Sequence, residues 1–138
     1  MENNKNNKIP QIIKDVGIGT AWNPKKVWKL NEPVTEIDIQ ELIWHFDIPF
    51  WDRGGKNKFN LTEFNLTPWE VIKYPENEPT HFRKIQEADI NHPIDIMENK
   101  GRWRILDGLH RLAKLYLGGH NKIKVRKIPR NKIPEIMR

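Results

Sequence analysis

The sequence predicts an α+β fold of short strands and short helices, and three segments in its C-terminal third predict it most directly. Residues 102–106 largely alternate polar and apolar side chains, as a half-buried strand does. Apolar residues then recur at the helical positions i, i+3, i+4 and i+7, at Leu109, Leu112, Ala113 and Tyr116. Residues 122–128 alternate basic and apolar side chains, which indicates a further strand after that helix.

The first half of the chain predicts an arm and then the start of the sheet. Residues 1–33 are expected to form an N-terminal arm, whose first ten residues are rich in Asn and Lys and are predicted to be disordered. Trp22 and Trp28 indicate that the rest of the arm packs on the body. Residues 35–39 alternate polar and apolar and are predicted as the first strand. An apolar, aromatic stretch (41–51) and a charged loop (52–58) follow.

The middle of the chain predicts two helices and a hairpin. Thr67 as N-cap, Pro68 at the first helical position and Glu70 three residues after the cap predict a short helix with a capping box. Residues 80–88 are predicted as a second helix. Residues 94–97 alternate, and an Asn-Lys-Gly turn at 99–101 connects them to the strand at 102–106. The helix of residues 108–117 is expected to end at two glycines, and the predicted body covers residues 34–129, with a basic tail at 130–138.

Composition excludes several classes of protein. The chain has 138 residues, enough for one domain with a real core, and its mean hydropathy of −0.77 is that of a polar protein. It has no cysteine, which excludes disulfides, thiol catalysis and cysteine-ligated zinc and fits a reducing compartment. The start of the sequence has no apolar signal core, and no run of 18 apolar residues occurs. We therefore expect a cytoplasmic protein without a membrane partner.

The net charge of +6 is unevenly distributed. Residues 100–138 carry 12 Lys and Arg against Asp107 and Glu135, whereas residues 1–99 carry 12 basic and 16 acidic residues. A basic half could contact nucleic acid, a nucleotide or an acidic partner. The simpler alternative is that the two halves neutralise each other across the fold.

The junction between the strand at 102–106 and the following helix is the strongest candidate site. Gly108, His110 and Arg111 lie in the first turn of that helix, where free N–H groups and the helix dipole favour an anion. Arg111 adds a forked donor that suits phosphate. Asp107 is expected to shape the site as the N-cap, with Gly108 easing the turn. The alternative for each side chain is a purely structural or solvated role.

The C-terminal part of the chain also resembles a known family. Residues 92–97 (HPIDIM) and 101–129 (GRWRILDGLHRLAKLYLGGHNKIKVRKIP) are similar to the ParB/sulfiredoxin superfamily. Members share a strand with Pro-Ile-x-Val, a hairpin, a strand ending in Gly-x-x-Arg at a helix start, an Ala-rich helix and a returning strand. With residues 35–42 as the opening strand, the resemblance spans roughly residues 34–129. It implies a small mixed sheet with flanking helices, and nucleotide phosphates bound at Arg111.

Departures from individual branches of the superfamily narrow what the resemblance implies. Sulfiredoxin has its catalytic cysteine where this chain has Leu109, so that chemistry is excluded. Partition proteins carry a Gly-Glu-Arg-Arg motif and a following DNA-binding domain, for which this sequence has no room. The Asp-Gly-x-His-Arg form at residues 107–111 is closer to that of a free serine kinase, which also uses a Glu from its N-terminal part as a base.

Three acids of the first half are candidates for that base or for a metal ligand: Glu41, Asp47 and Asp52. Asp47 is preferred, because neighbouring aromatic residues could desolvate it and change its pKa; the alternative is that it caps the turn at Pro49. Trp44, Phe46, Phe50 and Trp51 could wall a pocket beside the phosphate site, although most of the six tryptophans are expected to be core and rim packing. The five histidines have no recognisable metal-binding spacing.

The sequence therefore predicts a nucleotide-binding domain for a nucleoside di- or triphosphate such as ATP, ADP or CTP. Phosphoryl transfer or hydrolysis is the candidate reaction, with Mg²⁺ bridging phosphate and a carboxylate. The alternative is a non-catalytic DNA-binding accessory protein that uses the basic C-terminal third, or a nuclease, whose metal-binding carboxylates the sequence does not identify.

Overall fold

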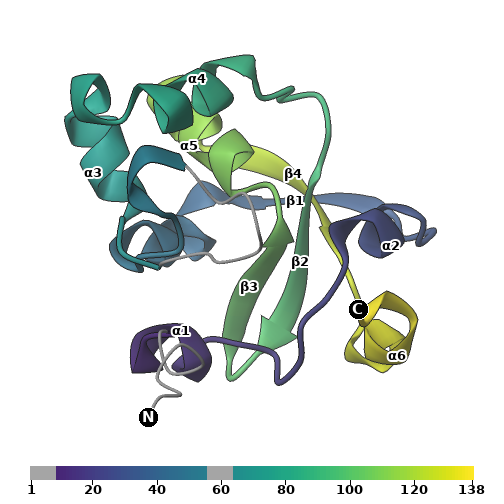
Figure 1. Ribbon diagram of the computed structural model, residues 1–138. Coiled ribbons are helices and arrows are strands. Elements are labelled where there is room, and N and C mark those ends of the chain that lie inside the picture. Colours follow the sequence, from purple (N-terminus) through teal and green to yellow (C-terminus); the bar gives the residue numbers. More distant parts are fainter. Residues whose placement is uncertain (1–8, 56–63) are drawn as a thin grey trace, which may run out of the picture.

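A four-stranded mixed sheet forms the centre of the molecule in a computed structural model that describes residues 9–55 and 64–138 (Figure 1). Its strands lie in the order β1-β4-β2-β3. Their bounds are Val34–Asp38 (β1), Ile94–Asn99 (β2), Arg102–Asp107 (β3) and Lys122–Lys127 (β4). Strands β1 and β4 pair antiparallel, β4 and β2 parallel, and β2 and β3 antiparallel. The α+β class and all four strands agree with the sequence-based expectation.

The β2–β3 hairpin is closed by the turn that the sequence predicts. Lys100 and Gly101 have φ of 54° and 85°, so both central residues are left-handed, as a tight two-residue hairpin turn requires. Asn99 pairs with Arg102 on either side of it. A register shift between Asp95 and Ile96 then brings Asp95 opposite Asp107, at the end of the hairpin where the next helix starts.

The basic strand β4 pairs with the acidic strand β1. In the register of this pair, Glu36 lies opposite Lys124 and Asp38 opposite Lys122, whose Nζ is 4.0 Å from the Asp38 carboxylate. Arg126, also on β4, forms a buried ion pair with Asp95 on β2, with 2.6 Å between Nε and Oδ1. Part of the charge asymmetry is thus neutralised between adjacent strands, as the simpler interpretation of the sequence expects.

Three helices are grouped at one end of the sheet (Figure 1): α3 (Pro68–Lys73), α4 (Pro79–Glu87) and α5 (Leu109–Leu117). Thr67 and Glu70 form the predicted capping box at the start of α3, and α5 ends at Gly118, followed by Gly119 with φ of 78°. Short 3-10 turns connect these helices with the sheet: η2 (Ile39–Glu41), η3 (Ile43–Asp47), η4 (Arg53–Gly55) and η5 (Pro75–Asn77). Burial of apolar side chains from the sheet, η3 and the three helices makes the main core.

The N-terminal arm packs on the body, as Trp22 and Trp28 suggested. It contains α1 (Gln11–Asp15) and α2 (Pro24–Trp28), and with η6 (Arg130–Lys132) and α6 (Ile133–Ile136) it builds a second, smaller core around Val27 and Ile136. Trp22 donates its Nε1 hydrogen to the carbonyl of Leu106 over 2.9 Å. The expected disorder of the first ten residues falls mostly outside the described residues, as does part of the charged loop at 52–58.

Within the described ranges 9–55 and 64–138, no helix combines the length and the hydropathy needed to cross a membrane.

Candidate functional site

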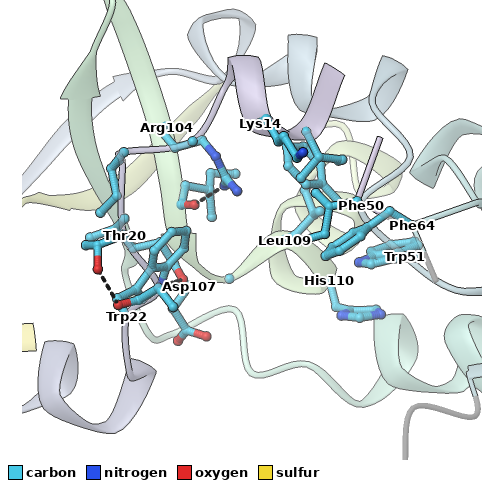
Figure 2. Close-up of a pocket in the computed structure, with 18 of the residues that line it drawn as sticks. Lys14, Thr20, Trp22, Phe50, Trp51, Phe64, Arg104, Asp107, Leu109 and His110 are labelled. Carbon is cyan, nitrogen blue, oxygen red and sulfur yellow. Dashed lines mark hydrogen bonds between the residues drawn. The ribbon is translucent and has the colours of Figure 1, made fainter. Parts of the chain in front are cut away.

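A cavity of about 830 Å³ lies where β3 ends and α5 begins. Figure 2 shows its two sides: Arg104, Thr20, Trp22 and Asp107 lie on one, and Lys14, Phe50, Phe64 and Trp51 lie on the other. The arm therefore contributes to both walls, because Lys14 belongs to α1 and Thr20 and Trp22 follow it in the chain. Leu109, His110 and Arg111, at the start of α5, also line the cavity.

The start of α5 depends on Gly108. This residue is the N-cap, with φ of 117° and ψ of 21°. A Cβ at this position would lie 2.9 Å from Nη1 of Arg111 and 3.1 Å from Cγ1 of Ile94, so only glycine fits without displacement.

Asp107 has a different role from the expected one. The prediction that Asp107 caps the helix is wrong: α5 has no side-chain cap, and the Asp107 carboxylate instead accepts a 2.7 Å hydrogen bond from Nε1 of Trp28. An Asp one residue too far from the helix cannot reach its N–H groups once Gly108 occupies the cap position. The first-turn N–H groups of α5 are consequently left without a side-chain acceptor from the cap.

Arg111 is partly used to hold the chain together. Its Nε donates to the carbonyl of Asp89 over 3.0 Å and its Nη1 to the carbonyl of Pro93 over 3.1 Å. These bonds tie the segment before β2 to α5. Nη2 has no partner among the described residues, and the side chain borders both the main cavity and a second one of about 540 Å³. The guanidinium therefore offers one free edge rather than its whole fork to a ligand.

Arg104 is the cation that sequence reasoning missed. It is largely buried, and burial lowers its pKa to about 10. Its Nε donates to the carbonyl of Val16 over 3.2 Å and its Nη1 to the carbonyl of Ile105, while its guanidinium lies over the ring of Phe50 at 4.4 Å. In the described part of the chain no carboxylate lies within ion-pair distance of it. Its polar position in the alternating strand pattern indicated only an outward-facing side chain.

Two histidines and a tryptophan form a layered cluster at the edge of the cavity. His81 Nδ1 lies 3.1 Å from His110 Nε2, and His81 Nε2 lies 2.7 Å from the backbone carbonyl oxygen of Asp52 and 3.6 Å from its carboxylate. Trp51 stacks on both imidazoles, with ring centroids 4.1 Å from His110 and 4.9 Å from His81. Burial, with smaller contributions from His81 and Lys84, lowers the pKa of His110 to about 3. His110 is thus a neutral imidazole.

The three candidate acids lie in three different places. Asp52 is separated from His110 only by the ring of His81. Asp47 is exposed at the end of η3, and Glu41 borders a different cavity together with Glu98 and Arg102. None of the three lines the main cavity. Residues 9–55 and 64–138 contain no group of three or more His, Asp or Glu side chains placed to hold a metal ion.

The aromatic residues divide between the cavity and the core. Trp22, Phe50, Trp51 and Phe64 line the cavity. Phe46 and Trp69 pack edge to face in the core, and Trp44 stacks on His45 beneath the Arg102 guanidinium. The expected aromatic wall from residues 44–51 is therefore made by Phe50 and Trp51 alone. Nothing in the local sequence distinguished these two from the others, because η3 ends at Asp47 and the chain continues extended at Ile48, and the sequence does not show which rings then border the cavity.

Comparison with protein-family models, with curated proteins and with solved structures finds no match to this chain.

Proposed function

We propose that the main cavity binds a nucleoside di- or triphosphate such as ATP, ADP or CTP. Arg104 is the observation that carries this proposal. A largely buried guanidinium without a carboxylate partner in the described residues is costly, and an anionic ligand in the cavity would offset that cost. The cavity is also within the usual size range of small-molecule sites.

The two kinds of cavity lining suit the two halves of a nucleotide. Trp22, Phe50 and Phe64 offer aromatic surface against which a base can stack. Arg104, Lys14 and the free edge of Arg111 are cationic. The start of α5 is electropositive, because no cap side chain accepts from its first-turn N–H groups. Such a helix start favours phosphate oxygens.

The resemblance to the ParB/sulfiredoxin superfamily supports the same proposal. We propose that the chain is a member of that superfamily in its Asp-Gly-x-His-Arg form, at residues 107–111. Within this proposal Gly108 provides the close backbone approach and Arg111 contacts phosphate through its free edge. His110 contributes as a neutral group, so it adds no charge to the phosphate site.

In this proposal Mg²⁺ binds together with the nucleotide. Mg²⁺ is commonly held by substrate phosphates, waters and one or two carboxylates rather than by a complete protein cage. Asp107 is the carboxylate that lines the cavity among the described residues, and one of its oxygens is occupied by Trp28. The described residues thus do not form a ready metal site, and no chemical step is assigned to the metal. Of the three candidate acids, Asp52 stays closest to the site.

A thermal-shift screen tests the proposed ligand. ATP, ADP and CTP are each added with and without Mg²⁺, because a ligand that binds only the native state raises the melting temperature. We expect a concentration-dependent rise for at least one nucleotide. No rise with any of them would contradict the proposal.

Arg104 variants connect that binding to the cavity. Arg104→Met should weaken nucleotide binding by tenfold or more, since a hydrogen bond to a charged group contributes about 1.5–3 kcal/mol. Arg104→Lys should restore part of the affinity. Arg83→Met, at an exposed position of α4, is the matched control and should bind as the wild type does. Equal affinity of Arg104→Met and wild type in calorimetry would exclude this site.

The alternative, DNA binding, makes a different prediction. Binding through several phosphates would collapse between roughly 50 and 200 mM salt. The affinity of a nucleotide that binds in the main cavity should be much less sensitive to salt. The pairing of β1 acids with β4 lysines already reduces the basic surface available to DNA.

A further inference from the structure

The hydrogen-bond chain through the two histidines determines where the proton of His110 resides. The carbonyl of Asp52 can only accept a hydrogen bond, so Nε2 of His81 carries a hydrogen. If that is the only hydrogen on the His81 ring, its Nδ1 has a lone pair. His110 then donates its Nε2 hydrogen to that lone pair over 3.1 Å. The two imidazole planes differ by only 9°, which allows an in-plane hydrogen bond.

It follows that Nδ1 of His110 carries the lone pair. This atom has no partner among the described residues. It is also not completely buried, because among the described residues only Trp44 Nε1 is a completely buried side-chain polar atom without a partner. His110 itself lines the main cavity. Trp51 stacks over both imidazole rings and restricts their rotation, so the Nδ1 edge of His110 keeps its position.

We propose that His110 is a specificity-determining hydrogen-bond acceptor, which requires a hydroxyl or amino donor on the ligand, and that His81 is the residue that positions it. Phosphate oxygens at neutral pH are acceptors and cannot donate to this lone pair. His110 therefore recognises the ribose or base part of a nucleotide, or an alcohol bound beside it, rather than its phosphates. The identity of the ligand rests on the proposed nucleotide binding, but the tautomer of His110 does not.

The tautomer is tested first on the wild-type protein without ligand. Long-range ¹H–¹⁵N correlation spectra at neutral pH distinguish a protonated from an unprotonated ring nitrogen. We expect protonated Nε2 and unprotonated Nδ1 in His110. In His81→Phe, which keeps a ring on Trp51 but removes the acceptor, His110 should become a mixture of tautomers. A hydrogen on Nδ1 in the wild type, or an unchanged tautomer in His81→Phe, would overturn the proposal.

The recognition is tested by comparing two ligands in calorimetry, ATP and inorganic tripolyphosphate, which lacks hydroxyl and amino donors. His110→Phe should lose about three- to tenfold affinity for ATP, the equivalent of one neutral hydrogen bond, with unchanged affinity for tripolyphosphate. His120→Phe, in an exposed loop, is the matched control. Equal losses for both ligands would place His110 against phosphate and overturn the proposal. If ATP does not bind the wild type, the proposed function fails while the tautomer experiment still decides the state of His110.

Discussion

At the scale of single residues, the histidines of this protein have different roles. His45 is completely buried, donates from Nδ1 to the carbonyl of Leu42 over 2.8 Å and accepts from the N–H of Ile105 over 2.9 Å. Ile105 lies on the edge strand β3, whose outer N–H groups have no neighbouring strand. His45 thus connects η3 to this edge, which is a structural role.

Replacing His45 should therefore destabilise the fold. His45→Ala leaves the buried N–H of Ile105 without its acceptor and opens a cavity, which together should cost about 2–4 kcal/mol of unfolding free energy. Urea denaturation measures this, with exposed His120→Ala as the control, which should stay within about 0.5 kcal/mol of wild type. A His45→Ala protein as stable as that control would show that the two hydrogen bonds contribute little.

Arg111 should affect both stability and binding. Arg111→Ala removes the hydrogen bonds to the carbonyls of Asp89 and Pro93 and should lower the unfolding free energy by about 1–3 kcal/mol. It should also weaken nucleotide binding. Arg111→Lys should recover only part of either property, because lysine lacks the planar fork. Wild-type stability and wild-type affinity in Arg111→Ala, measured by urea denaturation and calorimetry, would contradict both roles.

At the scale of elements, the strand–glycine–helix junction of β3 and α5 is the part that makes the site. A matched pair of substitutions tests it. Gly108 and Gly119 both have positive φ, but a Cβ at Gly108 meets Arg111 and Ile94, whereas a Cβ at Gly119 meets nothing within 4 Å. Gly119→Ala measures the backbone strain alone, about 1 kcal/mol. Gly108→Ala should cost clearly more and should displace Arg111.

The measurements for this pair are urea denaturation for stability and thermal shift for nucleotide binding. We expect Gly119→Ala to keep its nucleotide-induced rise in melting temperature and Gly108→Ala to lose most of it. Equal destabilisation of the two variants, with binding kept in both, would mean that the close contacts at Gly108 relax without consequence.

At the scale of the whole molecule, the buried histidines make the fold sensitive to acid. The pKa values of His45 and His110 are lowered in the folded state from 6.5 to about 3, chiefly by burial. Above pH 6.5 both states of the protein hold them neutral. As the pH falls below 6.5, the unfolded chain takes up protons that the folded protein does not, so stability decreases. His45 alone should contribute a slope of up to about 1.4 kcal/mol per pH unit, and His110 acts in the same direction.

Urea midpoints at pH 7.5, 6 and 5 test this. We expect a steep decrease below pH 6.5 and a shallower one in His110→Phe. Glu70, whose pKa is lowered below 4.5 chiefly by hydrogen bonds at Thr67, loses its stabilising effect only at lower pH. Burial raises the pKa of Asp95, so this carboxyl does not add to the decrease. A constant midpoint between pH 7.5 and 5 would show that these histidines become protonated without unfolding the protein.

The sequence alone determined the four strands and three of the helices of this protein, and the location of its most promising junction. Alternation, helical periodicity, the capping box at Thr67 and the Lys100-Gly101 turn are local signals, so all four strands and the helices α3, α4 and α5 were predictable. Arg104, His81 and the roles of Asp107 and Trp51 were decided only by the tertiary structure. His81 and His110 are 29 residues apart, and Trp28 reaches Asp107 across 79. Such pairings depend on how the arm and the helices pack around the sheet, and no local pattern of side chains encodes that packing.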